Sequence, residues 1–199
     1  LLHTLALGGL LQLGRALGDI NLGAALYTAL QMALLAGCFA LTCGSIARQS
    51  GARAAKRAAV FFALYPLNMV MAVNATKDVL FGGFFALTLA LLNEIQEKPS
   101  RGLALKIAVC GALAVMLRNN MAYAALVWLA LLTIGLRKGE KSAALAMLLA
   151  LAVGLCGNAA LKRATRAESG DMSEMLSWPI QQLARARLYD EERLTDAEK

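Results

Sequence analysis

Long apolar runs separated by short polar segments make up most of the chain. A helix needs roughly 20 residues to cross the ~30 Å hydrocarbon core of a bilayer. Several runs are shorter, so each is expected to extend by a turn into flanking polar residues or to lie partly inside the bundle. The pattern predicts an all-α, polytopic transmembrane bundle of about six to seven spans, the first truncated, at residues 1–14, 21–45, 58–75, 79–93, 103–117, 121–136 and 143–160.

Composition supports a membrane protein. Hydrophobic residues are 59% of the chain and charged residues 17%, with a mean hydropathy of +0.58. Soluble domains carry about 25% charged residues. These values exclude a disordered chain, a disulfide scaffold and an ordinary soluble enzyme with one core. The net charge of +7 does not indicate nucleic acid, because the positive residues lie between the apolar runs, where they set membrane orientation.

The loops alternate in charge, which predicts their sides. Short loops rich in Lys and Arg stay in the cytoplasm. Three loops have this character, and they carry Arg48, Arg53, Lys56 and Arg57; Lys98, Arg101 and Lys106; and Arg137, Lys138 and Lys141. The tight turns at Arg15, Lys77 and Arg118 are therefore predicted to face outward. A basic cluster of Lys162, Arg163 and Arg166 is the exception, since it follows the last span on the predicted external side.

The composition changes near residue 160, which predicts two parts. Residues 1–160 form the transmembrane domain, and 161–199 an external juxtamembrane segment with a short amphipathic helix at 179–189. That helix either lies on lipid or packs on its own domain. The chain opens inside an apolar run without Met and closes on a capping-box pattern at 195–198. We therefore expect a fragment of a longer protein that continues downstream, with a frayed natural terminus as the alternative.

Charged and amide side chains at the predicted outward turns are the candidate site. Lys77, Asp78, Arg118 and Asn119 stand where the sequence has almost no loop. A charge at mid-bilayer costs about 2.5–3.5 kcal/mol, so such residues generally face a bundle interior or a water-filled cavity. The predicted ligand is a phosphate carried on a lipid, because the cations lie at headgroup depth. In the alternative, Lys77 and Asp78 neutralise one another or extend to the membrane surface, and Asn119 and Asn120 cap the next helix.

Other features are weaker. Gln182 opens the amphipathic helix and is a candidate for contact with a polar ligand, although solvent exposure is the favoured explanation. Pro66 is expected to free a backbone carbonyl and kink its span. The lone histidine and four cysteines without ligand spacing indicate no metal site, and no cofactor is indicated. Close packing is expected at the glycines, namely Gly8 with Gly9, Gly82 with Gly83, and Gly154 with Gly157.

Four short motifs together resemble one group of proteins. The segments are YPLN at 65–68, NATKDVLF at 74–81, LRNN at 117–120 and MLSWPIQQLAR at 175–185. They resemble a bacterial group of multispanning proteins related to GT-C-type glycosyltransferases, the superfamily of protein mannosyltransferases and lipid A aminoarabinose transferases. The resemblance covers nearly the whole chain.

The resemblance implies transfer of a sugar from a polyprenyl-phosphate donor to an acceptor outside the cytoplasmic membrane. It also implies a catalytic carboxylate in the first external loop and a His-Pro motif, both expected upstream of Leu1, and an external soluble domain expected after Lys199. Asp78 does not fill that role, so the catalytic residue stays unassigned. Lys77 and Arg118, with the cluster at 162–166, would stabilise charge on the departing lipid phosphate.

Three other classes remain open from the sequence. A transporter or flippase of lipid-linked saccharides also needs cations facing a cavity, but no clear internal repeat is present and the charges gather on one side. A polymerase of surface polysaccharides would share the substrates and not the fold. In a membrane scaffold, Lys77, Asp78 and Arg118 would only bind neighbouring helices.

Overall fold

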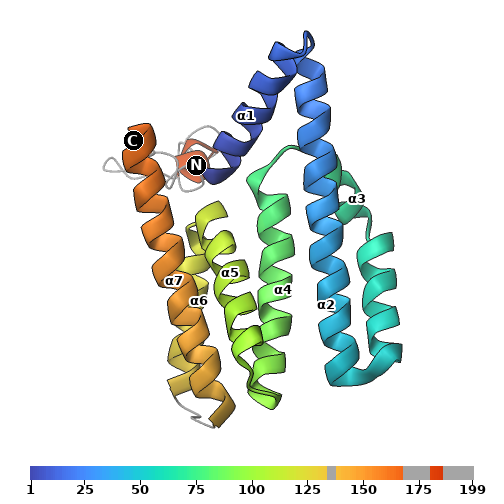
Figure 1. Cartoon of the computed structure of the whole chain (residues 1–199), viewed down its shortest axis with the longest axis vertical. Helices are drawn as coiled ribbons and strands as arrows, with labels where there is room; N and C mark the ends of the chain where they lie inside the picture. The colour runs from blue at the N-terminus through green and yellow to red at the C-terminus, as the bar shows by residue number, and fades with distance from the viewer. Residues whose placement is uncertain (134–137, 168–179, 186–199) are drawn as a thin grey trace. The chain divides into compact units, whose positions relative to one another are not determined.

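The chain folds into helices joined by short turns (Figure 1). The structure is a computed structural model that describes residues 1–133, 138–167 and 180–185, with the backbone alone at 131–133 and 138–140. Within these ranges there is no strand, so the all-α prediction is confirmed. The helices are α1 (Leu2–Ala16), α2 (Ile20–Leu64), α3 (Pro66–Val73), α4 (Lys77–Glu97), α5 (Arg101–Leu117), α6 (Asn120–Thr133) and α7 (Lys138–Thr165).

The 45-residue α2 is two helical arms joined at a reversal. Gly51 has φ 84° and ψ 168°, a conformation that glycine reaches without strain. The rings of Phe39 and Phe62 stack with centroids 4.2 Å apart, whereas one straight helix would separate them by about 34 Å. The arms are therefore antiparallel, as Figure 1 shows, and the basic residues 48–57 lie at their connection, where the sequence predicted a loop.

Pro66 ends the second arm of α2 and begins α3. A proline has no N–H to donate to the carbonyl four residues earlier, so the carbonyl of Phe62 loses its helical partner. The side chain of Asn68 donates from Nδ2 to that carbonyl at 3.1 Å. The expectation that Pro66 frees a carbonyl is confirmed, and Asn68 is the residue that satisfies it.

Glycines set the spacing between several helices. A Cβ on Gly14 would lie 2.5 Å from the backbone nitrogen of Gly23, so α1 and α2 meet at these two residues. A Cβ on Gly154 would lie 2.6 Å from Val115 of α5. The predicted packing is also found at Gly83 and Gly157. It is wrong at Gly8, Gly9 and Gly82, where a Cβ would meet nothing within 4 Å.

The described core lies among α2, α4, α5, α6 and α7, where the buried side chains include Leu91, Ile95, Ile107, Met121 and Met147. The exterior carries many large apolar side chains, such as Leu64 at 66% and Leu105 at 66% exposure. A few polar side chains, such as Gln31 and Glu94, are buried in the interior, while large apolar side chains cover the exterior. This distribution suits a lipid environment.

Three described helices are long and apolar enough to cross a membrane, namely Ile20–Leu64, Lys77–Glu97 and Lys141–Thr165. A shorter apolar helix covers Asn120–Ala130.

The chain divides into two compact units, residues 1–163 and 164–199. In the second unit, the described residues 180–185 are helical, and Ile180 and Leu183 are exposed at 49% and 64%. Trp178 and Tyr189, which bracket the predicted amphipathic helix, lie outside the described residues, as does the capping-box pattern at 195–198. The assignment of residues 1–160 to a transmembrane domain and of 161–199 to an external juxtamembrane segment stays a prediction.

Candidate functional site

The turn between α3 and α4 and the turn between α5 and α6 lie at the same end of the first unit (Figure 1). We call this end the Asp78 end. The connection at Gly51 and the turn between α4 and α5 lie at the other end, called the Glu94 end. The Asp78 end holds Lys77, Asp78, Arg118 and Asn119, so four of the five predicted site residues share it. The fifth, Gln182, lies in the second unit and is exposed there.

Asp78 and Arg118 form an ion pair that joins two turns distant in sequence. Nη1 of Arg118 donates to Oδ1 of Asp78 at 2.7 Å, with side-chain exposures of 41% and 48%. The guanidinium also lies over the ring of Phe81, 5.8 Å from its centroid. Asp78 is in the first turn of α4, where the helix dipole favours an acid. An exposed pair of this kind contributes about 0–1 kcal/mol to stability.

Lys77 is exposed at the start of α4, and its ammonium has no hydrogen-bond or ion-pair partner among the described residues. The alternative in which Lys77 neutralises Asp78 is not what the structure shows, because Asp78 binds Arg118 instead. Lys77 is therefore a cation at the Asp78 end that remains available to an anionic ligand.

An apolar cavity of about 360 Å³ reaches the Asp78 end. It lies between α2, α3 and α4. Most of its wall is aliphatic or aromatic, and Asp78 is its one charged lining residue. The described lining consists of Leu35, Phe39, Phe61, Phe62, Tyr65, Leu67, Asn68, Met71, Asp78, Val79, Gly82, Gly83 and Ala86. The ion pair of Asp78 with Arg118 thus borders a space that suits a hydrocarbon chain.

Asn119 lines a different cavity, between α6 and α7. This cavity has a volume of about 440 Å³, and Tyr123, Asn158 and Lys162 also line it. Asn158 donates from Nδ2 to the carbonyl of Val115 at 3.3 Å, near the end of α5. Asn119 is thus separated from the ion pair, and it shares a cavity with Lys162, one of the three basic residues on the predicted external side.

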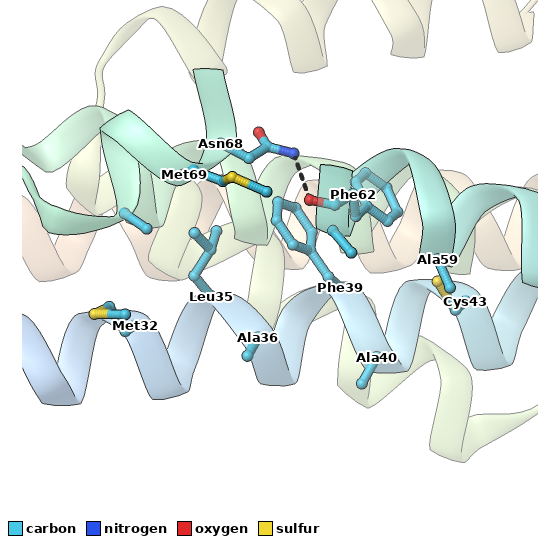
Figure 2. A pocket seen from close by; sticks show the side chains of 12 residues that line it. Met32, Leu35, Ala36, Phe39, Ala40, Cys43, Ala59, Phe62, Asn68 and Met69 are labelled. Carbon is cyan, nitrogen blue, oxygen red and sulfur yellow. Dashed lines mark hydrogen bonds between the residues drawn. The ribbon is translucent and has the colours of Figure 1, made fainter. Parts of the chain in front are cut away.

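Another cavity lies between the two arms of α2 and α3, and Figure 2 shows it from close by. It has a volume of about 520 Å³. Phe39, Phe62 and Met69 face one another across it, and the hydrogen bond from Asn68 to Phe62 lies at its edge. The walls are almost entirely apolar, which suits contact with lipid and offers no group for chemistry.

Three polar residues at the Asp78 end escaped the sequence analysis as site candidates. Tyr27 and Gln31 of α2 are 2% and 1% exposed. Gln31 donates from Nε2 to the carbonyls of Ala72 at 3.0 Å and of Asn74 at 2.8 Å. His3 of α1 packs edge-on against Tyr27 with ring centroids 5.4 Å apart. The signal was present in the sequence as polar residues inside apolar runs, but a single run does not reveal that they meet.

The Glu94 end holds a second polar network, also missed. Glu94 is 7% exposed. It accepts hydrogen bonds from Nε of Arg48 at 2.6 Å, from Nη2 of Arg48 at 2.9 Å and from Oγ of Ser45 at 2.5 Å. Gln49 and Asn93 extend the network through hydrogen bonds to Ser45 and to one another. The network ties α2 to α4 at the end where the sequence predicted only orienting charges.

Metal binding has no support in the described part of the chain, where no three His, Cys, Asp or Glu residues gather closely enough to hold an ion. The four cysteines are free thiols. What the site offers is therefore one exposed ammonium, one guanidinium paired to a carboxylate, and an apolar cavity beside them.

The fold and the site together define the class: an all-helical membrane protein with an exposed lysine and a paired arginine at one end, where the carboxylate bound to that arginine lines an apolar cavity. The chain belongs to DUF6020, a family of unknown function, whose profile matches residues 1–199. No curated protein and no solved structure matches the chain.

Proposed function

We propose that the chain is part of the membrane domain of a GT-C-like glycosyltransferase, which transfers a sugar from a polyprenyl-phosphate donor to an acceptor outside the cytoplasmic membrane. One observation carries the proposal. Lys77 and Arg118 lie at the same end of the bundle, and the carboxylate paired with Arg118 lines an apolar cavity. Cations beside an apolar space match a ligand whose phosphate is attached to a hydrocarbon chain.

The proposal includes a topology of six to seven crossings. α1 would provide the truncated first crossing, the first arm of α2 the second, the second arm together with α3 the third, and α4 to α7 the rest. The connection at Gly51 and the turn between α4 and α5 lie at the Glu94 end, and both carry Lys- and Arg-rich segments. The rule that such loops stay in the cytoplasm would place the Glu94 end inside, with the Asp78 end and residues 161–199 outside.

The cations would act on the leaving group. When the bond between the sugar and the phosphate breaks, negative charge grows on the lipid phosphate. Lys77 would supply a mobile point charge, and Arg118 a planar fork that has unused N–H groups beyond the one bound to Asp78. Asp78 would hold Arg118 in place until a phosphate competes for it. We assign no catalytic base among these residues.

Arg118→Ala in the full-length protein tests the role of this cation. We expect donor turnover to fall by about 10²–10³-fold, the effect of removing one preorganised electrostatic stabiliser. Turnover is measured with undecaprenyl phosphate carrying mannose, glucose or aminoarabinose. Arg53→Ala is the matched control, because Arg53 is an exposed arginine at the Glu94 end. Turnover equal to that of the wild type in Arg118→Ala would contradict the proposal.

The ion pair itself favours a second candidate, a structural tie between α4 and the turn after α5. In that case Asp78 and Arg118 would couple in a double-mutant cycle on stability, and neither variant would change ligand binding. The glycosyltransferase proposal expects the opposite, with weak coupling in stability and a large effect of Arg118 on turnover.

A further inference from the structure

Tyr27, Gln31 and His3 form a polar cluster, which we call the Tyr27 cluster, between α1, α2 and the turn after α3. Tyr27 and Gln31 lie four residues apart and therefore on the same face of α2. Both are almost completely buried, at 2% and 1% exposure. The ring of His3 meets Tyr27 edge-on at 5.4 Å. The hydrogen bond from Gln31 to the carbonyl of Asn74, three residues before Lys77, places the cluster beside the turn that carries the proposed phosphate site.

Three buried atoms of the cluster have no hydrogen-bond partner in the described structure: the hydroxyl of Tyr27, Oε1 of Gln31 and Nε2 of His3. The orientation of the Gln31 amide is fixed, because its nitrogen donates to the carbonyls of both Ala72 and Asn74. Its oxygen is therefore a pure acceptor that points away from the turn. Buried polar atoms in proteins nearly always have partners, so three together point to a ligand.

The chemistry of these atoms selects the ligand. An amide oxygen accepts, a phenol both donates and accepts, and an imidazole nitrogen does either. A phosphate does not fit, because its oxygens would face the oxygen of Gln31. A metal cation does not fit either, because the cluster contains no carboxylate or thiolate, and the described residues hold no group of three His, Cys, Asp or Glu that could bind one. Hydroxyl groups fit, since each can donate to Gln31 and accept from Tyr27.

We propose that the Tyr27 cluster is a binding site for the hydroxyl groups of a carbohydrate, held next to the cations that take the phosphate. This inference rests on the proposed function and deepens it, because it assigns the sugar and the phosphate to neighbouring but different residues. The hydroxyls belong either to the sugar on the lipid donor or to a sugar acceptor. His3 is half-buried, whereas Tyr27 and Gln31 are almost completely buried.

Binding to the full-length protein in nanodiscs tests the site. The probes are undecaprenyl phosphate, the same lipid carrying mannose, glucose or aminoarabinose, and free methyl mannoside, each titrated by calorimetry. The test variants are Tyr27→Phe, which removes one hydroxyl, and His3→Phe, which keeps a ring against Tyr27. Thr28→Val is the matched control, because its hydroxyl lies on the same helix but is exposed and bonded to Ala24.

We expect a glycosylated lipid to bind the wild type more tightly than undecaprenyl phosphate does. Tyr27→Phe should lower the affinity for the glycosylated lipid by roughly five- to tenfold, because one buried hydrogen bond is lost. It should leave the affinity for undecaprenyl phosphate unchanged. His3→Phe should act in the same direction, and Thr28→Val should change neither. The same dependence with methyl mannoside alone would support the site and identify an acceptor sugar as the source of the hydroxyls.

Two results would overturn the inference. One of them leaves the proposed function standing, and the other contradicts it as well. If undecaprenyl phosphate binds but Tyr27→Phe and His3→Phe leave the glycosylated lipid at its wild-type affinity, the cluster holds only water or is simply buried. The proposed function then stands without this site. If no probe lipid binds the wild type, the proposed function and the carbohydrate site fail together.

Discussion

The two ends of the helical unit carry polar residues in opposite ways. At the Glu94 end, a buried carboxylate receives three hydrogen bonds from Arg48 and Ser45. At the Asp78 end, the carboxylate is 48% exposed and receives one bond from Arg118. Beside it, Lys77 has no partner in the described structure and the Tyr27 cluster has three unpartnered atoms. The carboxylate at the Glu94 end is hydrogen-bonded within the protein, whereas the Asp78 end has polar groups that remain available to a ligand.

This difference separates stabilising from ligand-binding polar groups. A buried network that is fully hydrogen-bonded fixes the packing of its helices. Unpartnered polar groups cost stability, about 1–3 kcal/mol for each buried donor or acceptor, and such residues inside a membrane protein are functional candidates. We therefore assign the Glu94 end to folding and the Asp78 end to function.

The largest effect on stability is expected for Glu94→Ala. It leaves Ser45 and Arg48 without their shared acceptor. Breaking a buried pair costs about 3–5 kcal/mol, but Arg48 is 54% exposed and can reach water or lipid headgroups, so we expect about 2–3 kcal/mol. Unfolding in mixed detergent micelles measures the loss, with exposed Glu97→Ala as the control. Equal stability of the two variants would remove the contrast between the ends.

Asp78→Asn is expected to change stability much less than Glu94→Ala does, and to raise the affinity for the lipid phosphate. It removes an ion pair that contributes at most about 1 kcal/mol, so stability should barely change. Arg118 then has no competing carboxylate, and the affinity for undecaprenyl phosphate should rise by on the order of threefold, as a gain of about 0.6 kcal/mol. Calorimetric titration measures it. A loss of affinity would mean that Asp78 positions Arg118 rather than competing with the phosphate.

An effect of opposite sign is expected for Tyr27→Phe without ligand. The buried hydroxyl has no partner in the described structure, so removing it relieves the cost of an unpaired group and should raise the free energy of unfolding by up to about 1–3 kcal/mol. The same unfolding assay measures the shift. A clear destabilisation would show that the hydroxyl is bonded within the protein, and would weaken the case for the Tyr27 cluster as a binding site.

The sequence predicts where the helices begin and end better than it predicts which residues of different helices contact one another. The helix breaks at Tyr65, Asn74 to Thr76, and Arg118 to Asn119 follow from polar residues and proline between apolar runs. The pairing of Asp78 with Arg118 does not, because it joins turns that are 40 residues apart. Glu94 lies just outside the predicted span 79–93, and its burial is not visible in the sequence because it depends on Ser45 and Arg48 of another helix. Local patterns reveal exposure to lipid and water, whereas contacts between helices depend on packing.

The glycines show the same limit. A glycine pair in an apolar run is a reasonable sign of close packing, yet Gly8 and Gly9 face open space while Gly14 and Gly23 form the contact between α1 and α2. Which face of a helix meets its neighbour depends on the turn that joins them, here at Gly18 and Asp19. The spacing of glycines alone does not contain that information.

The most direct test of the account compares Arg118→Ala with Arg48→Ala in one preparation of the full-length protein. Calorimetry measures binding of undecaprenyl phosphate, and detergent unfolding measures stability. We predict that Arg118→Ala loses most of the binding and keeps its stability within about 1 kcal/mol, while Arg48→Ala loses about 2 kcal/mol of stability and binds as the wild type does. Full binding by Arg118→Ala, or equal loss of binding in both variants, would contradict it.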